Sequence, residues 1–222
     1  TLHRKLWCTF PNGSSNRNVM NSLVIKKRMN GSYADAGIRS SRGDHDLNPG
    51  MLPGQNLRQA AVLVPLIEHN DGLTVMLTKR TDHLDHHPGQ ISFPGGRIED
   101  DDPTPEYAAL REAEEEVGLQ RDQVDIIGRL DEYVVRAGFS VTPFVGLVQP
   151  DYTPIIDDFE VAEVFEVPLS FFMDENNHRR DSRTHNGEVR EFYAMPYGDY
   201  YIWGATAGML RNLYDILKPR EV

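Results

Sequence analysis

Three glutamates, Glu112, Glu115 and Glu116, have the side chains with the clearest chemical potential in this sequence. On a helix they crowd onto one face, where like charges at i,i+3 and i,i+4 spacing each cost roughly 0.2–0.5 kcal/mol. Carboxylates close to the end of a helix also oppose its dipole. A divalent cation held between them would reverse both penalties. Because every ligand on offer is an oxygen, Mg²⁺ is the natural candidate, with Mn²⁺ as the alternative.

A helix is indicated around these glutamates by signals at both of its ends. Thr104 is a good N-cap, Pro105 suits the first helical position, and Gly118 can take the left-handed conformation that ends a helix after Val117. A glutamate run on a helix is more often a solvated face than a metal site, so spacing alone leaves both interpretations open.

Two segments together resemble the Nudix box, the signature of the Nudix hydrolase superfamily: residues 93–97 (FPGGR) and 111–119 (REAEEEVGL). The usual box runs Gly, five residues, Glu, seven residues, then Arg-Glu-apolar-x-Glu-Glu-x-Gly-apolar. The second half is intact here. In the first half, Asp102 stands where the box has Glu, and eight residues separate it from Arg111. Which of the acidic residues at positions 99–102 plays the upstream role is left open.

The chemistry of a pyrophosphate linkage, together with the resemblance, suggests roles for four residues of the box. We expect Glu112 and Glu116 to bind the metal, which would neutralise phosphate oxygens and activate water. Glu115 would bind a further metal or help to activate water, and Arg111, four residues before it, would orient it.

Backbone and basic residues ahead of the helix are expected to bind the substrate. Gly95 and Gly96 would let the backbone approach metal and phosphate closely, and Arg80 would contact phosphate. Superfamily members often take an extra carboxylate from outside the box. Glu160 and Glu163 are candidates, and a surface role stays open for both.

The segment from residue 77 to residue 96 resembles the extra motif of the bacterial coenzyme A pyrophosphatase branch, apart from Thr81 and Asp85. This resemblance implies hydrolysis of coenzyme A or its derivatives to 3′,5′-ADP and (acyl-)4′-phosphopantetheine. The alternatives are a pyrophosphohydrolase of ADP-ribose or another dinucleoside pyrophosphate, and a non-catalytic module that senses a nucleotide. The expected partner is a small nucleotide, and a homodimer is left open.

The pattern of elements predicts an α+β fold. Strands are expected at 60–67, 73–78, 90–93, 124–134, 139–148, 160–167, 179–185, 189–193 and 200–203, with helices at 105–117, 168–173 and after Gly204. The resemblance sharpens this to a Nudix-type α/β/α sandwich with a mixed β-sheet and a loop-helix-loop metal site. Tyr200, Tyr201 and Trp203 would either pack in the core or stack on an adenine.

Composition divides the chain into a basic, poorly structured arm (residues 1–55) and a Nudix hydrolase domain (residues 56–222). The first 60 residues hold nine Lys and Arg against three Asp and Glu, although the net charge of the 222 residues is −11. Such an acidic body argues against nucleic-acid binding. The single cysteine excludes an intrachain disulfide. No apolar run reaches the ~18 residues that span a bilayer, so we expect a cytoplasmic protein, or a mitochondrial one if residues 1–34 are a transit peptide.

Overall fold

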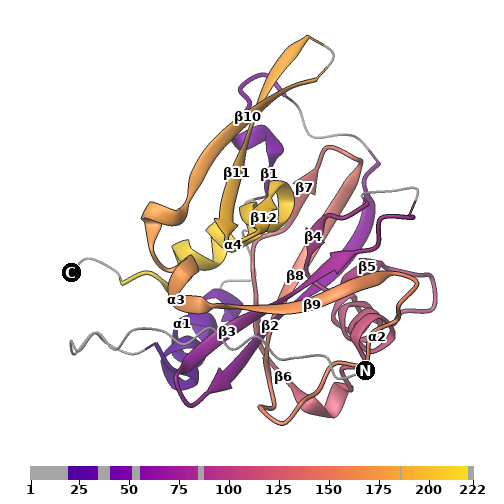
Figure 1. Cartoon of the computed structure of the whole chain (residues 1–222), viewed down its shortest axis with the longest axis vertical. Coiled ribbons are helices and arrows are strands. Elements are labelled where there is room, and N and C mark those ends of the chain that lie inside the picture. Colours follow the sequence, from indigo (N-terminus) through magenta and orange to yellow (C-terminus); the bar gives the residue numbers. More distant parts are fainter. Residues whose placement is uncertain (1–19, 35–40, 52–55, 85–87, 186, 220–222) are drawn as a thin grey trace.

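The computed structural model describes residues 20–34, 41–51, 56–84, 88–185 and 187–219 (Figure 1). The helices are α1 (Ser22–Ala34), α2 (Pro105–Val117), α3 (Leu169–Phe172) and α4 (Gly204–Leu217). The larger sheet holds β1 (Arg42–Gly43), β2 (Arg58–His69), β3 (Gly72–Arg80), β4 (Ile91–Ser92), β5 (Gly95–Arg97), β6 (Val124–Arg129), β7 (Tyr133–Val135), β8 (Phe139–Val148) and β9 (Val161–Pro168). The smaller sheet holds β10 (Arg179–His185), β11 (Glu188–Tyr197) and β12 (Tyr200–Trp203). Among the described residues, no helix is long and apolar enough to span a membrane.

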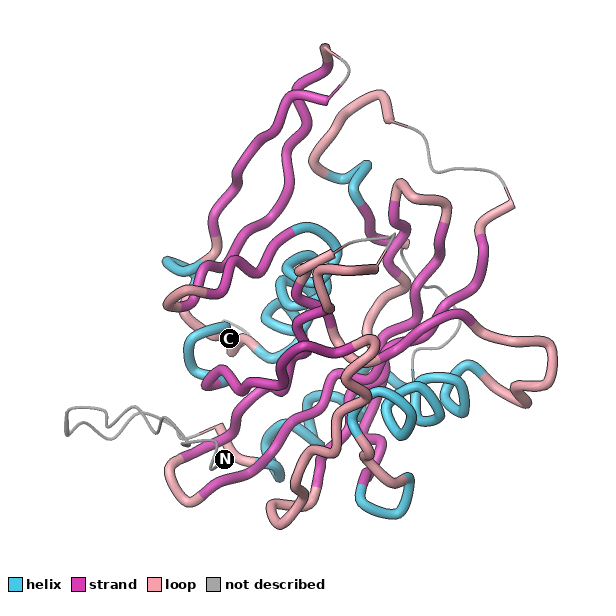
Figure 2. The backbone as a smooth tube through the Cα atoms, turned by 45° about the vertical axis from the view of Figure 1, so that its right-hand side comes forward, coloured by secondary structure: helices cyan, strands magenta, loops and turns pink. Residues whose placement is uncertain are grey.

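The larger sheet is mixed. Its main path runs β1-β7-β8-β2-β3-β4, with β5 paired to β2, β6 to β8 and β9 to β3. Strands β2 and β8 are parallel over ten residue pairs, and β1 and β7 are also parallel, whereas the other pairs are antiparallel. The smaller sheet is an antiparallel meander whose β10–β11 hairpin extends beyond the rest of the body (Figure 2).

Alternation along β2 explains why helices cover both faces of the larger sheet. Leu63 and Ile67 join a cluster with Ala113 and Val117 of α2. Val64 and Leu66, which point the opposite way in a strand, join the cluster that contains the buried residues of α1 and α4. A mixed sheet between helices confirms the predicted sandwich.

Helix α2 begins and ends where its capping residues predict. The Thr104 hydroxyl accepts a hydrogen bond from the Tyr107 N–H at 3.1 Å, and Pro105 is the first helical residue. Gly118 takes the left-handed conformation at φ 70°, and its N–H bonds to the carbonyls of Ala113 and Glu114. The glutamate-bearing helix is therefore fixed at both ends by local sequence.

The single strand expected at residues 124–134 is two strands, β6 and β7. Between them, Leu130 donates its N–H to the carbonyl of Pro143 on β8, and Pro143 has no N–H to return. The next residue, Asp131, turns its carboxylate toward Arg42 at 3.0 Å. The hydrogen-bond ladder to β8 is interrupted here because Pro143 cannot donate an N–H. Asp131 forms an ion pair with Arg42 in the gap between β6 and β7.

The described part of the expected N-terminal arm, residues 20–34 and 41–51, is folded onto the body, so the poorly structured arm is corrected for these residues. Ile25 and Met29 of α1 have no solvent exposure and belong to the main core. Arg28 donates a hydrogen bond to the carbonyl of Leu217 at the end of α4. Because the segment is mostly polar, its composition did not indicate that Ile25 and Met29, one helical turn apart, are core residues.

Strand β1 ties the same segment to the sheet. Arg42 bonds to Asp131 at 3.0 Å and to Asp215 of α4 at 2.8 Å, and the Tyr133 hydroxyl donates to Asp44 at 3.1 Å. These contacts join residues 42–44 to the larger sheet and to the last helix, so this part of the segment packs on the body.

We predict that Ile25→Ala lowers the free energy of unfolding by about 2–5 kcal/mol, because it leaves a cavity under α1. Urea unfolding measures the change. The matched control is Leu23→Ala on the same helix, at a side chain that is 74% exposed, which we expect to have almost no effect. Equal unfolding midpoints for the two variants would show that α1 does not dock as described.

Candidate active site

The glycine loop approaches β2 too closely for any side chain. Gly95 starts β5, which pairs with β2 through Val62. A Cβ at Gly95 would lie 2.5 Å from the Ala61 carbonyl oxygen and 2.6 Å from Val62 Cα, and its φ of +152° is one that other residues rarely adopt. Only glycine can therefore occupy position 95 of this loop.

Glu112 and Glu116 of α2 point their carboxylates at this loop. A Cβ at Gly96 would lie 2.5 Å from the carboxyl carbon of Glu112, so Glu112 occupies the space that glycine leaves. The Gly95 N–H donates a hydrogen bond to Glu116 Oε2 at 3.3 Å. Glu116 is only 6% exposed. The structure thus brings together the two glutamates and the two glycines that the sequence singled out.

Burial makes both carboxylates hard to ionise. Burial is the main cause that raises the pKa of Glu116, to about 8, and the negative charge of Glu112 raises it further. The Gly95 N–H and the charge of Arg80 act in the opposite direction. Burial also raises the pKa of Glu112, against a hydrogen bond from Arg111. Two desolvated, mutually repelling oxygen ligands fit a hard divalent cation, which would relieve both effects.

The described residues contain no group of three His, Cys, Asp or Glu side chains already gathered for a metal. Mg²⁺ usually keeps several waters and is bound by one or two carboxylates together with substrate phosphates.

Arg111 anchors the outer side of this cluster, and Asp102 is its principal partner. Nε and Nη2 of Arg111 donate to the two carboxylate oxygens of Asp102 at 3.0 and 2.9 Å. This bidentate pair is the main cause that lowers the pKa of Asp102, and it raises that of Arg111. Asp102 also accepts from the Glu99 N–H at 2.8 Å. Of the four acidic residues at positions 99–102, Asp102 is the one that pairs with Arg111.

The remaining donors of Arg111 reach the helix and the loop. Nη1 donates to Glu112 at 2.9 Å and to Glu115 at 3.1 Å, and Nη2 donates to the Arg97 carbonyl at 3.2 Å. With its N–H groups engaged, Arg111 is held as a positioning side chain. Glu115 is 60% exposed and lies on the outer side of the cluster, away from the buried position of Glu116.

Arg80 and Glu160 lie together beside the two metal-facing carboxylates. Arg80 Nη2 is 3.8 Å from Glu160 Oε2, and the charges of both residues act on the pKa of Glu116. Glu163, the other carboxylate considered from the sequence, accepts a hydrogen bond from the Tyr200 hydroxyl at 2.5 Å. Of the two, Glu160 is the one that the structure brings to the site.

The loop before β9 is bonded to the site. Thr81 donates its hydroxyl to the Phe159 carbonyl at 2.8 Å and its N–H to the Glu160 carbonyl at 3.0 Å. The Asp157 N–H reaches the Glu116 carbonyl at 3.0 Å. Sequence reasoning missed the anchoring role of Thr81, for which a local sequence carries no signal. Positions 85–87, which include Asp85, lie outside the described residues.

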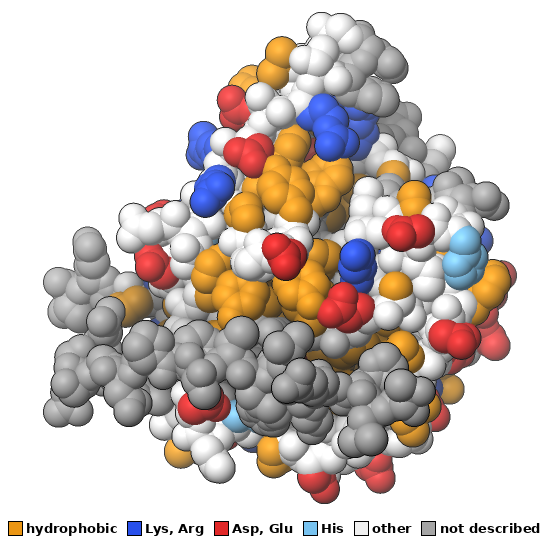
Figure 3. Space-filling view, viewed as in Figure 1, with side chains coloured by type: hydrophobic (Ala, Val, Ile, Leu, Met, Phe, Trp, Pro, Cys, Tyr) orange, Lys and Arg blue, Asp and Glu red, His pale blue; other side chains and the backbone are white. Residues whose placement is uncertain are grey.

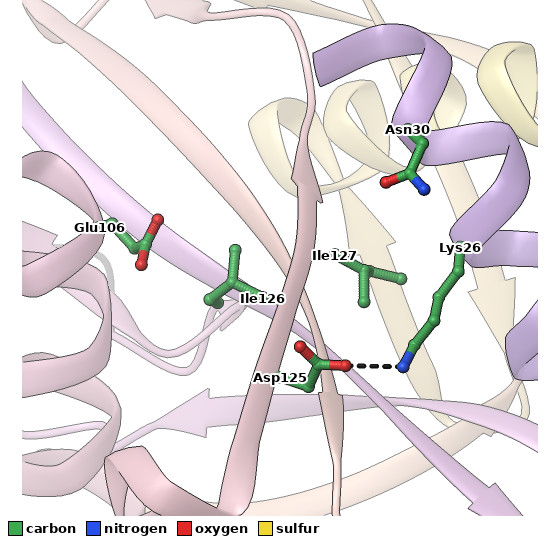
Figure 4. Close-up of a pocket in the computed structure, with 6 residues that line it drawn as sticks. All are labelled: Lys26, Asn30, Glu106, Asp125, Ile126 and Ile127. Atoms are coloured by element: carbon green, nitrogen blue, oxygen red, sulfur yellow. Dashed lines mark ion pairs between the residues drawn. The ribbon is translucent and has the colours of Figure 1, made fainter. Parts of the chain in front are cut away.

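A separate pocket lies between α1, β6 and the first turn of α2 (Figure 4). An ion pair of 2.7 Å between Lys26 and Asp125 crosses it. Its lining residues are Lys26, Asn30, Glu106, Asp125, Ile126 and Ile127. None of the residues to which the sequence assigned chemistry lines this pocket, so it is not the site.

Comparisons with known proteins agree with the box and its geometry. A family model described as NUDIX domain matches residues 57–200. A protein of Enterobacter sp. (strain 638) named "Uncharacterized Nudix hydrolase NudL" is 42% identical over 159 residues, which are 71% of this chain and 82% of that protein. Its counterpart in Escherichia coli (strain K12) is 40% identical over the same lengths. A crystal structure of a C. elegans Ap4A hydrolase is 19% identical, covers 50% of this chain and 80% of its own, and gives a TM-score of 0.44. By its family match and its bacterial relatives, the chain belongs to the Nudix hydrolases.

Proposed function

We propose that this Nudix hydrolase splits the pyrophosphate bond of coenzyme A or its derivatives in a Mg²⁺- or Mn²⁺-dependent reaction. The products are 3′,5′-ADP and (acyl-)4′-phosphopantetheine. The observation that carries the hydrolase activity is the burial of Glu112 and Glu116 against Gly95 and Gly96. The assignment of coenzyme A as the substrate rests on the resemblance of residues 77–96 to the coenzyme A pyrophosphatase branch.

Glu112 and Glu116 would hold the cation, which Nudix hydrolases generally require. When bound, a divalent ion neutralises phosphate oxygens and lowers the pKa of water. The glycine loop lets the substrate's phosphates approach these carboxylates without steric conflict.

Other residues of the site would position the glutamates, the substrate phosphate and the attacking water. Arg111 fixes the rotamers of Glu112 and Glu115 and is itself held by Asp102. Arg80, whose Nη2 lies 3.8 Å from Glu160 Oε2, would bind a phosphate of the scissile linkage. Glu160 would serve as the carboxylate from outside the box, either as a further ligand or as the base that takes a proton from water.

We expect Glu116→Gln to lower kcat at least about a hundredfold, because the neutral amide cannot provide the charge that holds the cation. Steady-state hydrolysis with Mg²⁺ measures the loss, and a thermal melt checks that the fold is intact. Glu114→Gln is the matched control: it makes the same change on the same helix at an exposed side chain. Near-normal turnover of Glu116→Gln would remove the metal assignment.

Substrate identity can be tested by comparing coenzyme A with 3′-dephospho-coenzyme A and ADP-ribose. A charge-assisted contact to the 3′-phosphate contributes roughly 1.5–3 kcal/mol, so kcat/KM should favour coenzyme A by about tenfold or more. If dephospho-coenzyme A or ADP-ribose is cleaved as well or better, the coenzyme A assignment fails. The broader pyrophosphohydrolase assignment would then take its place.

A further inference from the structure

The smaller sheet exposes a face on which arginines and aromatic rings lie together, and we call it the aromatic–arginine face. The register of β10, β11 and β12 places on it Asp181, Arg183, Arg190, Phe192, Tyr201 and Trp203, together with Arg179, Glu188, Ala194 and Pro196. The opposite face contains Met195 and Ile202, which are buried in the core. Figure 3 shows hydrophobic and basic side chains side by side over this sheet.

Two guanidinium groups on this face oppose one another. Arg183 and Arg190 are direct cross-strand partners, an arrangement that is destabilising for like charges. Arg190 donates to Glu188, yet its Nε is the one buried side-chain nitrogen or oxygen of the described residues with no hydrogen-bond partner. Asp181, the nearest carboxylate on β10, accepts from the Tyr201 hydroxyl at 2.6 Å. A bound anion would satisfy the arginines as no protein group does.

The rings beside these arginines suit a planar base. Trp203 lies 5.1 Å from Phe192 and 6.4 Å from Tyr201, measured between ring centroids, and Tyr201 is 43% exposed. The guanidinium carbon of Arg183 lies 5.2 Å from the Trp203 ring. Proteins bind nucleotides by stacking bases on aromatic rings and arginine planes while cations hold the phosphate.

Strand β12, which carries Tyr201 and Trp203, lies beside the strand that leads to the glycine loop. Strand β12 contacts β4, and the Thr206 hydroxyl just after β12 donates to the Ile91 carbonyl of β4 at 3.0 Å. β4 leads directly to the glycine loop. On β12, Tyr200 is stacked on Phe165 and bonded to Glu163, so it is committed to the body, whereas Tyr201 and Trp203 remain on the open side.

Arg80 does not fill the role of reading a second phosphate. Its guanidinium lies 3.8 Å from Glu160, and the proposed function assigns it to the scissile pyrophosphate. A substrate that carries a further phosphate on its nucleoside needs another cation near the site. Arg183 and Arg190 offer two such cations, and of the two only Arg190 is in an ion pair within the described residues, with Glu188.

We propose that the aromatic–arginine face binds the nucleotide end of the substrate. Trp203 and Tyr201 stack on the base, and Arg183 with Arg190 hold the phosphate on the ribose. This inference rests on the proposed function, because it takes a 3′-phosphorylated adenosine as the group to be recognised.

The fluorescence of Trp203 can report binding at this face. The chain has two tryptophans, so Trp7→Phe leaves Trp203 as the only emitter. In EDTA, 3′,5′-ADP should quench Trp203 fluorescence in a saturable way, and adenosine should do so at least about tenfold more weakly. Because 3′,5′-ADP has no pyrophosphate bond, the titration needs neither metal nor hydrolysis. Its failure is therefore distinct from failure of the proposed function.

Arg183→Gln should weaken the apparent affinity for 3′,5′-ADP about tenfold or more and raise the KM for coenzyme A without changing kcat. The matched control is Arg180→Gln, on the same strand and the opposite face, which should leave both values unchanged. Equal quenching by adenosine, or an affinity that Arg183→Gln does not alter, overturns the phosphate contact. Normal quenching with an unchanged KM in Arg183→Gln overturns the assignment of this face to the substrate.

Discussion

The burial of two carboxylates against a glycine loop is the interaction on which the site depends. Glu112 and Glu116 lie one turn apart on α2, Glu112 in the space beside Gly96 and Glu116 as the acceptor of the Gly95 N–H. This arrangement is unfavourable by itself, because burial and mutual repulsion raise the pKa of both groups. The surrounding fold must therefore hold the two carboxylates in place.

Three parts of the structure supply that support. The capped helix α2 packs on β2 through Ala113 and Val117. Asp102 accepts two hydrogen bonds from Arg111, and Arg111 in turn donates a hydrogen bond to Glu112. Backbone bonds from the loop before β9 to the end of α2 close the remaining side. The resulting rigidity is what a metal site needs, since its ligands must be correctly oriented before the ion arrives.

The sequence predicted what local rules determine. The caps of α2 and the strands expected at 60–67 and 73–78 depend on residues close together in the chain, and the structure contains all three. The division between β6 and β7 could not be foreseen, because it depends on Pro143 in another strand and on the pairing of Asp131 with Arg42.

Two further features depended on tertiary contacts that the sequence pattern does not encode. The docking of α1 rests on Ile25 and Met29, whose burial is decided by α4 and β6 rather than by the polar residues around them. The choice of Asp102 among four neighbouring acidic residues depends on which of them reaches Arg111. Proximity to the site likewise distinguishes Glu160 from Glu163.

The most direct test of the central claim is the free energy of unfolding of wild type and Glu116→Gln, with and without Mn²⁺. Because the pKa of Glu116 is raised in the folded state, from 4.5 to about 8, the folded protein retains a proton that the unfolded chain releases, and stability falls as pH rises across that interval. About one pH unit above the folded pKa, the metal-free Gln variant should be more stable than wild type. Mn²⁺ should then stabilise wild type and leave the variant almost unchanged. A variant that is less stable than wild type without metal, or that gains as much stability from Mn²⁺, would contradict the account.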